Sequence, residues 1–301
     1  MQNDDAALPF DAAIIGGSYA GLSAAMQLAR ARRRILVIDA GVRRNRFAAH
    51  AQGLTPQDGG APDAIADDAR AQVLAYPDVT WRQASATGAG GAIDRFTIED
   101  DAGGRWQARR LVLATGVEDT LPAIEGLRER WGRSVFHCPY CHGFELDRGR
   151  IGVIAVDEIS MHQALMLPDW GTTTLFTNQA FTPDDAQRNA LAARAVAIES
   201  LRIARIGEQA TVELVDGRRL PMDGLFVASR TRVNGTLAQA LGCAFEPGPL
   251  GDFIRTDALK ATSVPGVFAC GDAARGAHSV AFAIGDGMQA GVSAHRTLMF
   301  G

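Results

Sequence analysis

A glycine-rich turn near the start of the chain limits the possible fold more than any other feature. Residues 16–21 read Gly-Gly-Ser-Tyr-Ala-Gly, between an apolar run at 10–15 and an alanine-rich stretch at 22–31. A second apolar run, 34–39, ends at Asp39. The order strand, glycine turn, helix, strand, acid is the fingerprint of a dinucleotide-binding α/β unit. We predict that the turn holds a pyrophosphate at a helix N-terminus and that Asp39 holds a ribose. The alternative is a glycine-rich turn without a ligand.

Two details of this region leave its geometry open. Ser18 replaces the usual middle glycine, so its hydroxyl either crowds the phosphate or donates to it. A polar cluster, Arg43 to Arg46, follows the second strand. These residues either contact a diphosphate or form a solvated basic loop, and the sequence does not separate the two.

The middle of the chain repeats the same architecture without its binding residues. A strand beginning at Ile151, a helix at 158–167 and a strand at 173–176 mirror the first unit. The turn between them carries Asp157 and Glu158 in place of glycines, and their charge would repel a pyrophosphate at a helix N-terminus. Residues 177–179 contain no arginine for an NADPH 2′-phosphate. We predict a duplicated fold that has lost its nucleotide.

A pair of cysteines stands just before this second unit, in the run His-Cys-Pro-Tyr-Cys-His at 137–142. Two thiols separated by two residues can close a small disulfide, and a helix start lowers a thiol pKa. We interpret Cys138 and Cys141 as a redox couple. His142 is the candidate acid and base because an unperturbed histidine pKa lies near 6.5, and His137 is a candidate helper.

Three other interpretations of the cysteines are possible. Cys-x-x-Cys-His is also the haem attachment signal, but the first ten residues are acidic and do not resemble an export signal. Zinc needs four converging ligands, which a six-residue span supplies poorly. A structural disulfide is uncommon in a reducing compartment, where we place the protein.

The overall composition excludes several classes of function. The 301 residues suffice for two domains, and 47% hydrophobic with 21% charged residues is typical of globular proteins. The net charge of -4 arises without a basic block, so no nucleic-acid partner is expected. No apolar run reaches the length of a membrane span, and we expect a cytoplasmic protein without membrane contact.

Four pieces taken in order resemble the low-molecular-weight thioredoxin reductases over essentially the whole chain. They are GGSYAG at 16–21, ATG at 114–116, CPYC at 138–141 and VPGVFACGDA at 264–273. The resemblance implies an α/β fold with two Rossmann-like, three-layer domains. Residues 1–117 plus 246–301 would form a discontinuous FAD-binding domain, and 118–245 a degenerate NAD(P)-binding-like domain that carries the CPYC motif.

The resemblance also implies where FAD would bind. Asp272 would bind the ribityl chain of FAD, and the helix that begins at 278–280 would face the flavin ring. The complete set of expected cofactor residues is Gly16, Gly17, Ser18, Tyr19, Ala20, Gly21, Asp39, Ala40, Arg44, Asn45, Thr115, Gly116, Gly271, Asp272, Ser279 and Val280. No metal is expected.

The departures from thioredoxin reductases point to one branch of the family. The missing nucleotide residues, and His142 where an aspartate is usual, are more similar to the dithiol oxidases of the gliotoxin and holomycin type. Such enzymes oxidise a small dithiol and pass electrons through FAD to oxygen. The expected activity is therefore FAD-dependent oxidation of a dithiol by Cys138 and Cys141 without NADPH, with oxygen or a protein electron carrier as acceptor.

Two other functions stay open. One is a reductase of thioredoxin-like partners that is fed by ferredoxin, another donor or NADPH. The other is a flavin-bound redox sensor without turnover. A homodimer is implied by the resemblance alone.

Overall fold

The first sheet is built from strands that bury apolar side chains on both faces of the sheet. The structure, a computed structural model, describes residues 9–301. In β1 (Phe10–Ile15), Ala12 and Ile14 enter one hydrophobic core, and Ala13 and Ile15 enter another on the opposite face. Successive side chains of a strand point to opposite faces, so a strand with apolar residues on both faces needs a covering layer on each side. The result is a three-layer α/β arrangement.

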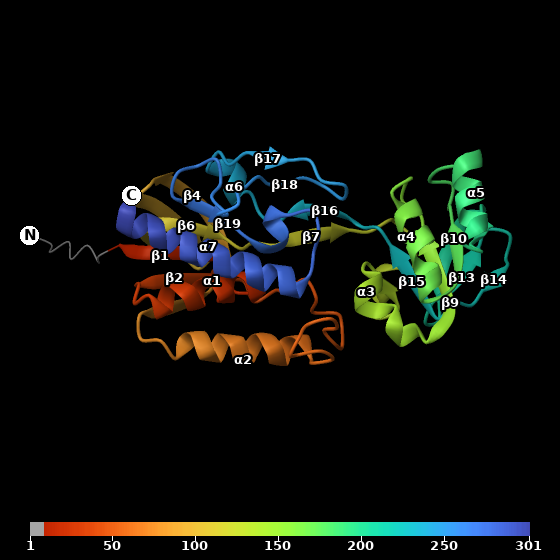
Figure 1. Ribbon diagram of the computed structural model, residues 1–301, viewed down its shortest axis with the longest axis horizontal. Helices are drawn as coiled ribbons and strands as arrows, with labels where there is room; N and C mark the ends of the chain where they lie inside the picture. Colours follow the sequence, from red (N-terminus) through yellow and green to blue (C-terminus); the bar gives the residue numbers. More distant parts are fainter. Residues whose placement is uncertain (1–8) are drawn as a thin grey trace, which may run out of the picture. The chain divides into compact units, whose positions relative to one another are not determined.

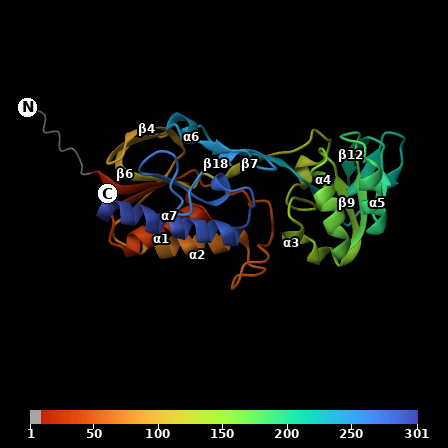
Figure 2. The same cartoon turned by 45° about the horizontal axis from the view of Figure 1, so that its top comes forward.

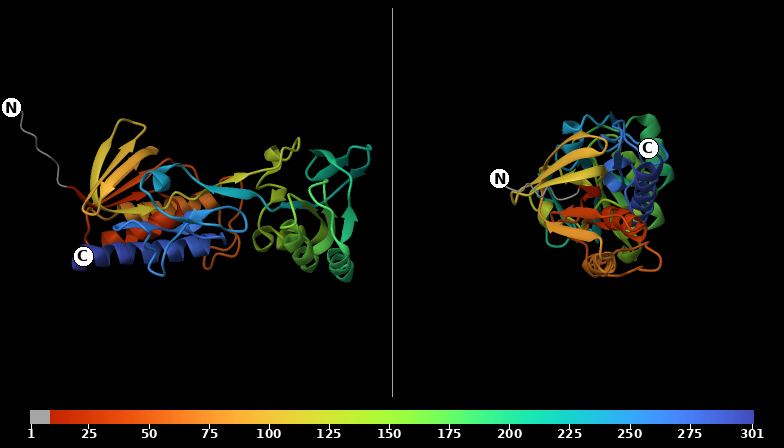
Figure 3. Two further views of the ribbon diagram at one scale, coloured as in Figure 1. Left: turned by 90° about the horizontal axis from the view of Figure 1, so that it is seen from above. Right: turned by 90° about the vertical axis from the view of Figure 1, so that its left-hand side faces the viewer.

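The sheet of this first unit has seven strands in the order β3-β2-β1-β6-β5-β4, with β19 joined to β6 (Figure 1). The pairs of β1 with β2 and β6, of β2 with β3, and of β6 with β19 are parallel, whereas β4 and β5 add an antiparallel hairpin, orange in Figure 3. The bounds are β2 (Ile35–Asp39), β3 (Val79–Gln83), β4 (Ala86–Ala92), β5 (Arg95–Asp100), β6 (Arg105–Leu113) and β19 (Val267–Ala269).

Helices α1 (Tyr19–Arg30), α2 (Pro62–Leu74) and α7 (Val280–Phe300) supply the core on one face of this sheet. Helices α1 and α7 lie side by side (Figures 1 and 2). A Cβ added to Gly287 would lie 2.0 Å from the carbonyl oxygen of Ala20, and one added to Gly291 would lie 2.6 Å from that of Ala24. Glycine at these two positions therefore permits the close approach of α7 to α1.

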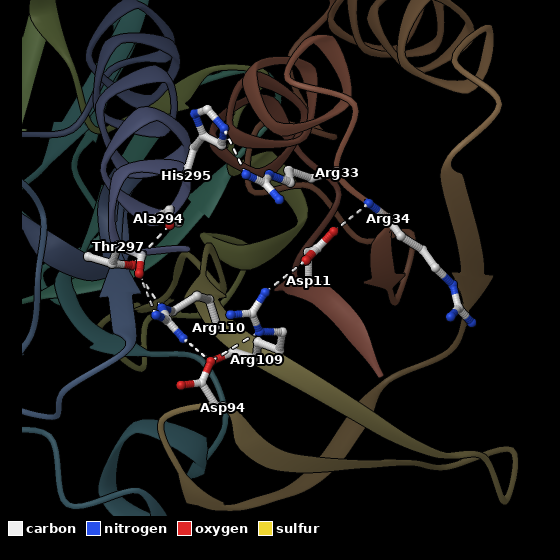
Figure 4. A network of polar contacts seen from close by, with 9 residues as sticks. All are labelled: Asp11, Arg33, Arg34, Asp94, Arg109, Arg110, Ala294, His295 and Thr297. Atoms are coloured by element: carbon white, nitrogen blue, oxygen red, sulfur yellow. Dashed lines mark hydrogen bonds and ion pairs between the residues drawn. The ribbon is translucent and has the colours of Figure 1, made fainter. Parts of the chain in front are cut away.

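A buried arginine fixes the last turn of α7 to the sheet (Figure 4). Arg110 on β6 donates to the carbonyl oxygen of Thr297 at 2.6 Å and to its hydroxyl at 2.8 Å. The same guanidinium donates to Asp94 at 2.8 Å, which holds the pKa of that carboxyl below its usual value. A cation at a helix C-terminus stabilises the last carbonyl groups, so this contact anchors the end of the chain.

The second unit has a five-stranded parallel sheet in the order β11-β10-β9-β15-β8. A three-stranded antiparallel sheet, β12-β13-β14, accompanies it. The strands are β8 (Val135–Phe136), β9 (Arg148–Ile154), β10 (Gly171–Phe176), β11 (Ala197–Glu199), β12 (Ile203–Gly207), β13 (Thr211–Leu214), β14 (Arg219–Leu220) and β15 (Gly224–Val227). The helices are α3 (Pro139–His142), α4 (Ser160–Met166) and α5 (Asp185–Ala193).

By their internal contacts, the units comprise the chain up to Arg44 with 63–118 and 231–301, and 45–62 with 119–230. The chain crosses between them at β7 (Val117–Thr120) and β16 (Arg230–Val233), which pair with each other. The return to the first unit thus falls near Thr231, whereas the sequence indicated 246. The reason is that Leu237 and Ala238 of α6 (Leu237–Ala240) are buried in a core of the first unit. The short strands β17 (Phe245–Glu246) and β18 (Phe253–Ile254) follow.

Some expected elements differ in their bounds. The segment 86–92 forms strand β4, which no motif of the sequence indicates. Alanine and glycine, which make up most of β4, are poor strand formers, so pairing with β5 decides its conformation. The helix expected from Glu158 begins at Ser160.

Candidate active site

The glycine turn after β1 has a backbone that other residues could not adopt without a clash. Gly16 has a φ of 103°, and a Cβ there would lie 2.3 Å from the carbonyl oxygen of Ala114. A Cβ on Gly21 would lie 1.8 Å from the carbonyl oxygen of Gly16. These contacts bring α1 close to the end of β6, where Thr115 and Gly116 follow.

The first turn of α1 has no side-chain cap. Ser18 occupies the N-cap position, but its side chain makes no capping hydrogen bond. The first amide groups of a helix have no partner within it, so an anion placed there meets both donors and the positive end of the helix dipole. The sequence-predicted pyrophosphate site therefore has the chemistry that a pyrophosphate requires.

Asp39, at the end of β2, is tied to the same turn. Its Oδ1 accepts a hydrogen bond from the amide of Gly17 at 2.9 Å. A carboxylate has two oxygen atoms, so one can hold the turn while the other accepts a ribose hydroxyl. Ala40 follows and is exposed. Tyr19 and Ala20 are buried in the core beneath α1, so packing accounts for their side chains.

Two buried polar atoms in this region have no partner within the described chain. One is the hydroxyl of Thr115, and the other is Nε1 of Trp81. Trp81 lies against the turn, because a Cβ on Gly17 would come within 2.4 Å of its ring. Buried polar atoms are usually satisfied, so such atoms next to a dinucleotide turn fit a bound ligand. The sequence did not single out Trp81, since a lone tryptophan in a strand carries no motif.

The C-terminal segment completes this group of residues. Gly271 begins a 3₁₀ turn, Gly271–Ala274, and a Cβ on it would lie 2.8 Å from that of Ala20. Asp272 pairs with Arg44 at 2.8 Å. Ser279 caps α7 by accepting from the amide of Phe282 at 3.1 Å, and Val280 is the first residue of that helix. The expected cofactor residues of the first unit thus come together from three distant segments.

Asn45 directly follows Arg44, at the point where the chain passes from the first unit to the segment 45–62, which groups with the second unit. Its role toward a cofactor stays a prediction. Two arginines of the polar cluster at 43–46 form different ion pairs. Arg43 pairs with Asp63 of α2, whereas Arg44 pairs with Asp272.

The cysteine motif of the second unit leaves β8 and enters the short helix α3. Cys138 is the N-cap residue and Pro139 the first helical residue, a position that suits the fixed φ of proline. The amide of Cys141 donates to the carbonyl oxygen of Cys138 at 3.2 Å, and their sulfur atoms lie 2.7 Å apart. The local turn thus brings the two sulfur atoms together.

The two histidines flanking the pair have different surroundings. The ring of His142 stacks on Phe136 with ring centroids 4.1 Å apart, and burial lowers its pKa to about 4. The expectation that the pKa of His142 lies close to working pH is therefore wrong, because desolvation disfavours the imidazolium. His137 instead contacts Ser229, whose hydroxyl oxygen lies 3.3 Å from Nδ1. Ser229 has no motif around it and was not expected.

The other two cysteines are poorly suited to redox chemistry. Cys243 and Cys270 are both buried, and burial raises the pKa of each thiol, for Cys270 to about 12. A thiol that stays protonated is a weak nucleophile. Among residues 9–301, no three histidine, cysteine or acidic side chains gather as metal ligands would. No helix in the same range is both long and apolar enough to cross a bilayer.

Comparisons with known proteins agree with this arrangement. The family model described as pyridine nucleotide-disulphide oxidoreductase matches residues 10–166 and 182–287. "Thioredoxin reductase sirT" of Leptosphaeria maculans is 34% identical over 94% of this chain and 92% of its own length. An oxidoreductase from Agrobacterium tumefaciens is 54% identical with a TM-score of 0.95, over 97% of this chain and 99% of that one. The solved structure of HlmI is 36% identical with a TM-score of 0.90, over 96% and 92%.

The residues around the glycine turn fit FAD, which is the cofactor of these flavoproteins. The described fold has the two Rossmann-like domains of the low-molecular-weight thioredoxin reductases. The chain is therefore an FAD-dependent enzyme of the pyridine nucleotide-disulphide oxidoreductase family, in its thioredoxin reductase-like branch.

Proposed function

We propose that the enzyme oxidises a dithiol to a disulfide with Cys138 and Cys141, and that electrons pass through FAD to oxygen without NADPH. In this proposal the unit that contains the glycine turn serves FAD, and the unit that contains the cysteine pair has lost its nucleotide. A homodimer, which rests on resemblance, and a cytoplasmic location, which rests on the sequence pattern, are part of the same proposal.

The observation that carries the proposal is that side chains already hold backbone amides of the turn before α4. Oδ1 of Asp157 accepts from the amide of Ile159 at 2.8 Å, and the hydroxyl of Ser160 accepts from the amide of Val156 at 3.0 Å. Side chains of the turn thus occupy amides that a pyrophosphate would need. Neither helix has a side-chain N-cap, but in the turn before α1 the side-chain bond is the one from the amide of Gly17 to Asp39, the expected ribose ligand on the neighbouring strand. The two turns occupy equivalent places in the two units but differ in their access to an anion.

Charge adds to this obstruction. Two like charges 4 Å apart repel by about 4 kcal/mol at an effective dielectric constant of 20, so a pyrophosphate beside Asp157 would bind weakly. Arg230, a cation that could attract a phosphate to this turn, already pairs with Asp157. The turn after β10 offers no replacement, because Asn178 accepts from the amide of Ile203 at 2.8 Å and serves the local fold.

The sulfur chemistry needs only residues of this chain and the substrate. A substrate thiolate attacks Cys138 of the disulfide form, the bond between Cys138 and Cys141 breaks, and Cys141 leaves as a thiolate. The second substrate thiolate then attacks the mixed disulfide at the substrate sulfur, which releases Cys138 as a thiolate. The substrate has lost two electrons and two protons, and the cysteine pair holds both electrons. Bound FAD supplies the two-electron acceptor that restores the disulfide.

A reductase of thioredoxin-like partners is the second candidate, because several relatives carry the name thioredoxin reductase. In that case electrons would enter from ferredoxin, another donor or NADPH and leave through the same sulfur atoms. The blocked turn before α4 favours a donor other than NADPH.

The test is a pair of anaerobic titrations of the purified holoenzyme. Dithiothreitol should bleach the flavin absorbance, whereas NADPH should leave the absorbance unchanged. Admission of air to the bleached enzyme should restore the absorbance and form peroxide. Replacement of Cys138 by serine should abolish the bleaching, whereas Cys243→Ser is a matched control that should retain it. Rapid stoichiometric bleaching by NADPH would overturn NADPH independence. Bleaching by reduced ferredoxin but not by dithiols would favour the reductase.

A further inference from the structure

A hydrogen-bond chain joins the histidine before the cysteine pair to a carboxylate. Ser229 is fully buried, and its hydroxyl donates to Oδ1 of Asp119 at 2.8 Å. The same oxygen lies 3.3 Å from Nδ1 of His137. Asp119 belongs to β7, and Ser229 directly precedes β16. All three residues belong to the second unit, so the chain of contacts is internal to it.

Counting hydrogen atoms assigns a direction to these contacts. A hydroxyl has one hydrogen atom, and an ionised carboxylate only accepts. The hydrogen of Ser229 therefore points to Asp119, and the contact with His137 requires that Nδ1 carry the hydrogen and donate to Oγ. A neutral imidazole has a single N–H group, so Nε2 becomes the acceptor nitrogen of the ring.

The backbone of His137 is held as well. Nε2 of Gln163, a buried residue of α4, donates to the carbonyl oxygen of His137 at 2.7 Å. The ring is thus restrained through Ser229 and the main chain through Gln163. Both restraints act on the residue that directly precedes Cys138.

We propose that Asp119 and Ser229 are positioning residues that fix His137 as the Nδ1–H tautomer and make its Nε2 the base for thiol chemistry at Cys138. The inference rests on the proposed dithiol oxidation. Nε2 takes the proton of a substrate thiol, which yields a substrate thiolate and an imidazolium. The thiolate attacks Cys138, and the imidazolium later returns the proton to a thiolate released from the cysteine pair. Asp119 stabilises the imidazolium through Ser229.

This assignment transfers the acid and base role from His142 to His137. His142 stacks on Phe136, and burial keeps its ring neutral. A ring that resists protonation is a poor acceptor for a thiol proton. The ring of His137, in contrast, is linked through the hydroxyl of Ser229 to the carboxylate of Asp119.

The tautomer can be observed directly, without turnover. Nitrogen NMR of the ¹⁵N-histidine-labelled holoenzyme, with His137 assigned by loss of its signals in His137→Gln, distinguishes Nδ1–H from Nε2–H. Wild type should show hydrogen on Nδ1. In Asp119→Asn the new amide can donate to Ser229, whose hydroxyl then donates to Nδ1, so hydrogen should move to Nε2. Asp185→Asn, at an exposed site on α5, should leave the spectrum unchanged.

A second readout follows the thiols. Alkylation of the reduced enzyme by iodoacetamide, located by peptide mass spectrometry, should slow at Cys138 by roughly tenfold or more in Ser229→Ala and in Asp119→Asn. Ser200→Ala, an exposed serine of the same unit, should react as wild type does. Adding Ser229→Ala to His137→Gln should cause no further loss, because Ser229 acts through His137.

The outcomes separate this inference from the proposed function. Hydrogen on Nε2 in wild type, or an unchanged tautomer in Asp119→Asn, overturns the inference even if dithiols bleach the flavin. Hydrogen on Nδ1 together with no response to dithiols upholds the tautomer and overturns the dithiol oxidase. If Asp119→Asn does not fold, the wild-type spectrum and Ser229→Ala decide.

Discussion

Replacement of His142 by phenylalanine should remove a specific source of acid sensitivity from the second unit. The ring of His142 stacks on Phe136, and burial lowers its pKa from the ordinary 6.5 to about 4. The unfolded chain therefore takes up a proton between pH 6.5 and pH 4 that the folded chain refuses. By linkage, the stability that depends on a neutral His142 is fully present above pH 6.5 and is lost as the pH falls toward 4.

The size of the effect follows from the same two values. At 1.36 kcal/mol per pH unit, the interval corresponds to a loss of about 3 kcal/mol in the free energy of unfolding by pH 4. Phenylalanine keeps the stacked ring but does not titrate. The difference in stability between wild type and His142→Phe should therefore change by about this amount between pH 7 and pH 4, and the other titrating groups cancel in the comparison.

Hydrogen exchange of the β9 amides, followed by mass spectrometry, measures unfolding of the second unit itself. This choice is necessary because a chain of two units need not unfold in one step. Proton NMR of the His142 ring provides the direct titration. A measured pKa above 6, or parallel pH dependences of wild type and His142→Phe, would refute the reasoning.

Two other substitutions and one labelling experiment test the fold and the site. Gly21→Ala should yield colourless protein, because its Cβ would lie 1.8 Å from a backbone oxygen, whereas Gly285→Ala has open space and should stay yellow; absorbance of the purified variants decides. Arg110→Met should lower the unfolding free energy by about 1–3 kcal/mol in urea titrations, since buried hydrogen bonds at the end of α7 are lost, and a loss as small as that of the exposed control Arg105→Met would contradict the anchoring role. In the reduced enzyme at pH 8, iodoacetamide should label the CPYC pair and spare Cys270, whose pKa burial raises to about 12, as peptide mass spectrometry will show; rapid labelling of Cys270 would contradict its burial.

Much of the fold could be predicted because local pattern and tertiary structure agree there. The apolar runs at 10–15 and 34–39 form parallel strands, as predicted, and the glycine turn leads into helix α1. Family and cofactor followed from the order of four motifs and were confirmed. Strand β4 could not be predicted, because only its partner β5 holds its glycines in a sheet.

The site was only partly readable for a similar reason. Their spacing in the sequence indicates the roles of the cysteine pair and of Asp39. Ser229 and Asp119, in contrast, form a hydrogen bond across 110 positions of sequence, which no local pattern indicates. The environment of His142 depends on burial against Phe136, which no spacing encodes. The roles of both histidines remain predictions that the experiments above address.

The pairing of β19 with β6 has a consequence for biosynthesis. Strand β6 ends at Leu113, but its partner begins at Val267, and α7 emerges last of all. At roughly 5–20 residues per second, a ribosome needs about 8 to 30 s to make the intervening segment. During that interval the middle unit can fold, whereas the flavin-binding unit still lacks strand β19 and helix α7. We therefore expect the cofactor to bind only after β19 and α7 have been made.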